Sequence, residues 1–150
     1  MALKNAPDLT QRPPRSPRVR LGGFAILPRT LDKGRALLAG KNGEYFFACP
    51  LDQRFLEFAG IDAEALKKQL AAGKSDGEIL AWVRKAAKNK HTEPEILAWS
   101  ALQDHRAPAD TESRAFFQGQ HTKIAPKRDD IANWFDLLDL DDYVTFGGQP

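Results

Sequence analysis

The sequence has a single cysteine, Cys49, among 150 residues, so no disulfide can form within the chain. That lack favours a reducing compartment, because small proteins of oxidising compartments usually depend on several disulfides. Long apolar runs are also missing, and none approaches the roughly 20 residues that a membrane helix requires. The N-terminal stretch MALKNAPDLTQRPPR has neither an apolar core nor a cleavage pattern of a signal peptide. These absences predict a cytoplasmic protein without membrane contact.

Metal and cofactor signatures are equally scarce. His91, His105 and His121 lie far apart and no second cysteine accompanies them, so we expect no metal site. Gly22 and Gly23 form a glycine pair, but the spacings of phosphate-binding and dinucleotide-binding loops are absent, and we expect no cofactor. The net charge of only +2 gives no argument for a nucleic-acid partner, which is disfavoured although not excluded.

What the sequence does contain is a series of helix-start signals. The apolar fraction of 42% and the charged fraction of 28% are those of an ordinary globular protein. Asp62 is a typical N-cap, and Ser75 with Glu78 and Thr92 with Glu95 form capping boxes before apolar stretches of helical period. We therefore predict an all-α protein, a single compact domain of about six helices packed orthogonally, with an extended Pro/Arg-rich N-terminal arm.

Several element boundaries follow from the same signals. A helical pattern begins at Leu21, and Pro28 either lies in the first turn of that helix or kinks it. The stretch 44–49 is the one candidate for extended structure, and 119–126 has the composition of a loop. A last helix is expected to start at Asp129 or Asp130, and the acids after Leu138 in it should have cationic partners or water.

The arm, residues 1–20, is predicted to lack regular structure because its prolines remove backbone donors and favour extended conformations. We expect it to pack on a helical domain formed by residues 21–150. The N-terminal third of the chain is basic, whereas the C-terminal end is rich in aspartate. The arm arginines therefore have two readings: they bind an anionic partner, or they pair internally with the acidic C-terminal helix, which is slightly favoured.

A cluster of cations around one acid is the most distinctive feature of the chain. On a helix, Asp32 lies three residues from Arg29 and from Arg35, so it can reach either guanidinium and orient it for a phosphate or carboxylate. The alternative is a surface ion network that contributes little to stability. The candidate anion-binding residues are Arg18, Arg20, Arg29, Asp32, Lys33 and Arg35.

Three functions remain open from the residues alone. The first is a binding module for an anionic small molecule or an acidic protein surface, held by that cluster. The second is a small enzyme acting on a phosphorylated or carboxylated metabolite, in which Asp32, His121 or Cys49 supplies acid–base or nucleophilic chemistry. The third is a structural protein whose arm docks into another copy of the chain. Binding ranks above catalysis because no known catalytic spacing is present.

The motifs also carry a resemblance that covers nearly the full length. The segments RPPRSPRVRLGG, LPRTLDKGRA, GKNGEY, CPLDQRFLEFAGID and DGEILAWV, and the stretch from IAP to FDLLDLDD, resemble the hallmark segments of a bacterial family of small proteins, DUF5069, catalogued as a domain of unknown function. Its most specific element, LPRxxDKxRA, stands intact here. The resemblance implies a single compact helical domain, and it implies no particular activity.

Overall fold

The computed structural model describes residues 5–150, which fold into helices and connecting loops with no β-strand in that range. The helices are α1 (Leu27–Leu38), α2 (Pro50–Ala59), α3 (Ala63–Ala71), α4 (Asp76–Ala86), α5 (Glu93–His105), α6 (Thr111–Ile124) and α7 (Trp134–Thr145). The prediction of an all-α protein is confirmed. The described residues contain seven helices rather than about six.

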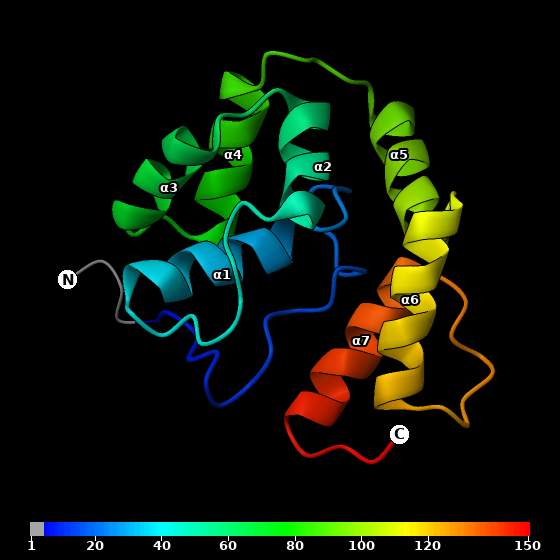
Figure 1. Cartoon of the computed structure of the whole chain (residues 1–150). Coiled ribbons are helices and arrows are strands. Elements are labelled where there is room, and N and C mark those ends of the chain that lie inside the picture. The colour runs from blue at the N-terminus through cyan, green and yellow to red at the C-terminus, as the bar shows by residue number, and fades with distance from the viewer. Residues whose placement is uncertain (1–4) are drawn as a thin grey trace.

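Helix α1 is largely enclosed by the rest of the molecule, since nine of its 12 residues are buried. It contacts α2 and α3, whereas α7 packs against α5 and α6 in a second group of helices (Figure 1). The core around α1 includes Phe55 of α2, Leu66 of α3, Ile79 of α4 and Phe135 of α7, all at most 2% exposed. Because apolar side chains from both groups meet on it, α1 is enclosed along most of its length, and its polar side chains are buried with it.

The predicted helix starts are confirmed at three positions. Asp62 accepts a hydrogen bond from the backbone of α3, and reciprocal capping boxes join Ser75 to Glu78 and Thr92 to Glu95. Such caps satisfy backbone N–H groups that the first turn of a helix leaves without partners. The starts of α3, α4 and α5 are therefore determined locally, within a few residues of sequence.

The start of α1 is set by the backbone before it. Gly22, Gly23 and Ile26 all have positive φ angles, of 59°, 85° and 74°, so the chain from Leu21 forms a turn instead of a helix. The helix begins at Leu27, and Pro28 lies in its first turn, where the missing N–H is not needed. Of the two positions predicted for Pro28, the structure shows the one in the first turn of the helix and not the kink.

Two boundary predictions were wrong at the C-terminal end. The stretch 119–126 was expected to be a loop, but α6 continues to Ile124 because a single glycine, Gly119, lowers helix propensity without ending a helix. The last helix begins at Trp134 instead of Asp129 or Asp130, since the side chain of Asn133 caps it.

The stretch 44–49 forms turns and contains no strand. Its neighbour Asn42 accepts a backbone hydrogen bond from Tyr45, which closes a turn between α1 and α2. A segment this short has no partner strand among residues 5–150, so it cannot form a sheet of its own. None of the helices in this range is both long enough and apolar enough to cross a membrane.

The described part of the arm, residues 5–20, has no helix or strand. Leu9 is 1% exposed and donates its N–H to the carbonyl of Lys41 at 2.8 Å, and Pro17 accepts from Ile26 at 2.9 Å. These backbone bonds hold the arm beside α1 and bring its arginines to that helix. The first four residues of the predicted arm lie outside the described range.

The close approach of α1 and α3 makes a testable prediction at Gly34. A Cβ on Gly34 would lie 2.5 Å from Leu70 Cδ1 and 3.1 Å from Phe47 Cε2, so Gly34→Ala should lower the free energy of unfolding by about 1–3 kcal/mol. Gly119→Ala is the matched control. No heavy atom lies within 4 Å of its Cβ, and it should raise that free energy by about 0.5–1 kcal/mol. Urea denaturation measures both, and a gain in both variants would contradict the packing.

Candidate functional site

The candidate cluster falls on two segments of the chain. Arg29, Asp32, Lys33 and Arg35 belong to α1, and Arg18 and Arg20 belong to the arm. Because α1 lies in the core, Arg29 and Lys33 are each only 3% exposed, and Asp32 is 9% exposed. Charged groups so deeply buried must find partners, since an isolated buried charge costs several kcal/mol.

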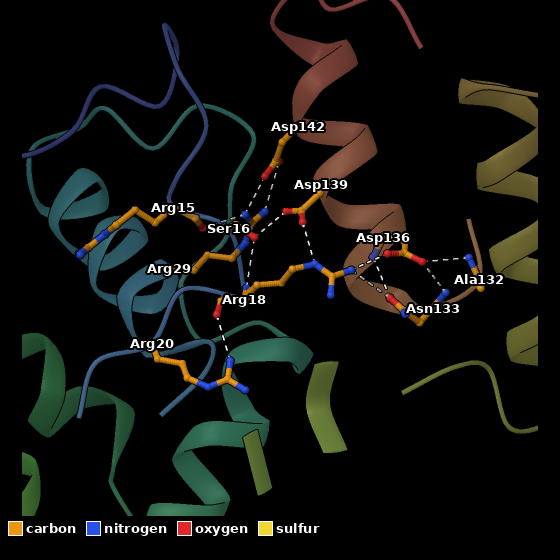
Figure 2. Close-up of polar contacts among 10 residues, drawn as sticks. All are labelled: Arg15, Ser16, Arg18, Arg20, Arg29, Ala132, Asn133, Asp136, Asp139 and Asp142. Carbon is orange, nitrogen blue, oxygen red and sulfur yellow. Dashed lines mark hydrogen bonds and ion pairs between the residues drawn. The ribbon is translucent and has the colours of Figure 1, made fainter. Parts of the chain in front are cut away.

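Arg29 points away from α1 towards the acidic end of α7 (Figure 2). Its guanidinium donates to both oxygens of Asp142, at 2.7 and 3.3 Å, and also to the carbonyl of Arg15 at 3.2 Å. The Tyr45 hydroxyl donates to Asp142 at 2.8 Å, and its ring lies under the Arg29 guanidinium. Burial and the bond to Asp142 raise the pKa of Tyr45 above its ordinary value, so the phenol keeps the proton it donates.

Lys33 forms the second buried ion pair of α1. Its ammonium lies 2.9 Å from Asp52 Oδ2, and this oxygen has no other polar partner within residues 5–150. The other oxygen of Asp52 accepts from the Thr30 hydroxyl at 2.7 Å, and Asp52 itself is 0% exposed. Lys33 Nζ also lies 3.2 Å from Cys49 Sγ, at the N-terminus of α2.

Asp32 does not pair with Arg29 or Arg35, so that prediction was wrong. It faces the arm instead, where it accepts from the Arg15 backbone at 2.9 Å and from the Arg15 guanidinium at 3.0 Å. Arg15 reaches on to Asp76 at 2.7 Å, and Arg35 donates to the same carboxylate at 2.8 Å. Helical spacing showed that Asp32 was within reach of two arginines, but the arm lies closer to its carboxylate than either of them.

The two arm arginines of the cluster also have internal partners. Arg18 crosses to α7, where its guanidinium binds Asp136 and Asp139, and Ser16 donates to Asp139 at 2.7 Å (Figure 2). Arg20 donates to Asp104 of α5 at 2.7 Å. The internal alternative for the arm is therefore the arrangement seen for Arg18. Of the acids after Leu138, Asp139 pairs with Arg18 and Asp142 with Arg29, whereas Asp141 forms no ion pair within residues 5–150.

Every cation of the candidate cluster is thus matched to a carboxylate of the same chain. The structure brings Asp32 and Arg35 together with Arg12, Arg15 and Asp76, and it separates them from Arg29 and Lys33 in the core. The residues of the first group line a cavity of about 480 Å³ between the arm, α1 and the start of α4. Its lining includes Arg12, Arg15, Asp32, Arg35, Lys74 and Asp76.

Sequence reasoning left several of these residues out of the cluster. Arg15 was recognised as an arm cation but not as the partner of Asp32, because that contact joins residues 17 apart. Asp76 and Lys74 flank the capping residue Ser75, and the capping box was the available signal for their position. Nothing in the sequence indicated which cation would face the Asp76 carboxylate.

The residues of the enzymatic alternative do not converge. Asp32 is bound by Arg15, and His121 Nε2 lies 2.6 Å from the carbonyl of Arg128, in another part of the molecule. Cys49 borders a cavity of about 250 Å³ with Arg29 and Lys33, but its polar neighbour is the ion-paired ammonium and not a base such as histidine. Among residues 5–150, no three His, Cys, Asp or Glu side chains gather in a way that could hold a metal ion.

The buried lysine predicts an asymmetry between two Lys→Met substitutions. Lys33→Met removes the partner of a fully buried carboxylate and should lower the free energy of unfolding by about 3–5 kcal/mol. Lys67→Met removes a surface pair with Glu64, 3.0 Å apart on α3, and should change it by less than about 0.5 kcal/mol. Urea denaturation at pH 7 distinguishes them, and equal losses would mean that Lys33 does not neutralise Asp52.

Asp76 predicts a pH dependence. Partial burial would raise its pKa, but the hydrogen bonds from Arg15 and Arg35 outweigh burial and hold the pKa below its ordinary value. Its ion pairs therefore stabilise the fold above the unfolded pKa, and that contribution is lost as pH falls through the folded pKa. The stability difference between the wild type and Asp76→Asn should be constant near neutrality and shrink below about pH 4. A difference unchanged from pH 7 to the acid limit of folding would contradict this.

Comparison with known proteins gives a single family. No curated protein matches the chain. The family model DUF5069, described as a domain of unknown function, matches residues 11–144, which include the described arm from Gln11, all of α1 to α6 and most of α7. The match confirms the resemblance that the arginine- and proline-rich motifs indicated. The chain belongs to the DUF5069 family.

Proposed function

We propose that the protein is a binding module that holds a small phosphate- or carboxylate-bearing ligand in the cavity between the arm, α1 and the start of α4. The observation that carries this proposal is the charge of the cavity. Four cationic side chains, Arg12, Arg15, Arg35 and Lys74, line it against two acids, Asp32 and Asp76. An excess of positive charge in a recess attracts anions, because the low-dielectric walls concentrate the field.

The two kinds of cation in this cavity have separate roles. Arg15 and Arg35 are fixed, since both are bound to the Asp76 carboxylate. Arg12 is exposed and makes no ion pair within the described residues, and the Lys74 ammonium there hydrogen-bonds only to the amide of Gln69. Arg12 and Lys74 would therefore neutralise the charge of the ligand. Arg15 and Arg35 would orient the ligand, because their planar guanidinium groups match the geometry of oxyanions.

The proposal keeps only part of the candidate cluster. Arg35 and Asp32 line the cavity, with Asp32 as the organiser of Arg15. Arg29 and Lys33 are enclosed by their aspartate partners, and Arg18 and Arg20 belong to ion pairs outside this recess. These four residues are assigned to the scaffold, because a ligand would have to displace a carboxylate to reach any of them.

The test uses inorganic phosphate and citrate as probes in isothermal titration calorimetry. The wild type should bind at least one of them, and Arg12→Gln and Lys74→Gln should each weaken that binding about fivefold, since each removes one unneutralised charge. Lys85→Gln is the matched control: it removes an exposed cation of α4 that does not line the cavity. Thermal unfolding should be nearly the same in all three variants.

Two outcomes would remove the proposal. One is that the wild type binds neither probe. The other is that Arg12→Gln and Lys74→Gln bind as tightly as Lys85→Gln, which would mean that net charge alone governs the interaction. Because Arg12 and Lys74 carry no ion pair within residues 5–150, a loss of binding in their variants is not a consequence of lost structure.

A further inference from the structure

A second cavity, of about 380 Å³, lies between α2, α5, α6 and α7 and shares no lining residue with the charged cavity described above. Its wall is largely apolar and includes Leu51, Phe116, Ile124, Trp134, Leu137 and Leu138. Phe116 at its edge is 61% exposed, so the apolar surface continues outwards. A concave apolar surface of this size with a few polar groups is the usual form of a small-molecule site.

Gln103 of α5 is a buried polar residue in the lining of this cavity. The residue is only 4% exposed and its side-chain amide makes no hydrogen bond to any of residues 5–150, but the amide atoms themselves remain accessible from the cavity. Since Gln103 lines the cavity and its amide has no partner among residues 5–150, the amide can hydrogen-bond to a molecule held there.

Two guanidinium groups line the same cavity, those of Arg54 from α2 and Arg106 at the end of α5. Both are partly buried, and neither side chain makes an ion pair or hydrogen bond within the described residues. Partial burial lowers the pKa of Arg106, and no acidic group offsets that effect. This differs from the two arginines of α1 and from Arg15, Arg18 and Arg20 of the arm, which are matched to aspartates. The one acid in the lining is Asp141. Its burial and the nearby charge of Asp142 raise its pKa.

We propose that this cavity binds a small apolar carboxylate, with its hydrocarbon part against Trp134 and Leu138 and its carboxylate on Arg106, Arg54 and the amide of Gln103. A guanidinium fork and an amide N–H are the donors that a carboxylate accepts best. Removing the hydrocarbon from water supplies affinity, and the carboxylate sets the orientation. The inference is independent of the proposed function, because it uses other residues and another face of the molecule.

The charge pattern decides the class of ligand. A neutral apolar molecule would fill the cavity but leave both guanidinium groups unpaired, and a cation would be repelled by them. A free phosphate would leave the apolar wall in contact with water. A carboxylate attached to a chain or ring satisfies both requirements. Decanoate and 2-naphthoate are suitable probes, because they place the same anion on an aliphatic and an aromatic body.

The experiment compares decanoate, 2-naphthoate and decan-1-ol by calorimetry, with tryptophan fluorescence as a second readout because Trp134 lines the cavity. At least one carboxylate should bind about tenfold more tightly than decanol, since the alcohol lacks the charge. Arg106→Gln and Gln103→Leu should each remove most of that preference. Whichever carboxylate binds more tightly identifies an aliphatic or an aromatic ligand.

Arg114→Gln is the matched control, because it removes an exposed arginine of α6 that does not line the cavity. It should leave the preference for the carboxylate unchanged. Arg54→Gln gives a second test if Gln103→Leu does not fold, as judged by circular dichroism. The proposal is overturned if decanol binds as tightly as both carboxylates, if none of the probes binds, or if Arg106→Gln behaves like Arg114→Gln.

Discussion

The fold depends on the neutralisation of the polar face of α1. Arg29 and Lys33 lie four residues apart on a helix that the rest of the molecule encloses, and each is 3% exposed. Their partners come from two different helices, Asp142 from α7 and Asp52 from α2. If one partner were missing, a charge would remain buried in apolar surroundings at a cost of several kcal/mol. The two pairs therefore fix how α1 sits between the two groups of helices.

Such pairs specify an arrangement more than they stabilise it. The attraction between two buried charges is largely offset by the water that both lose, so an apolar pair of similar volume can be equally stable. What the pairs exclude is any packing in which α1 rotates or shifts relative to α2 and α7, because each charge would then lose its partner. The segment LPRTLDKGRA, which forms most of α1, therefore serves chiefly to assemble the core.

Because the ion pairs of the core and the arm occupy these arginines, a binding site is better sought elsewhere. The arginines that stand out in the sequence are already bound to aspartates, and a ligand would have to compete with an internal carboxylate for each of them. Cations that line a cavity and have no such partner among the described residues are less conspicuous: Arg12 and Lys74 at one cavity, Arg54 and Arg106 at another. Charge that the fold leaves unbalanced is a better guide to binding than charge that is merely clustered in sequence.

The sequence predicts well what is decided within a few residues. Asp62, Ser75 and Thr92 start helices because a cap needs only the backbone that follows it. The partner of a buried charge, by contrast, is decided by residues distant in sequence: Arg29 and Asp142 are 113 residues apart. The acidity of the C-terminal end indicated that partners would be found there, but the pairing itself depends on how α7 packs. The unpaired amide of Gln103 left no trace in the sequence at all.

A double-mutant cycle on Arg29 and Asp142 tests this account most directly. The free energies of unfolding of Arg29→Met, Asp142→Leu and the double variant are compared with the wild type by urea denaturation. Each single variant leaves one buried charge alone, whereas the double variant leaves none, so the account predicts a coupling of at least about 2 kcal/mol and a double variant more stable than either single one. Additive losses, with coupling near zero, would show that α1 does not depend on its ion pairs.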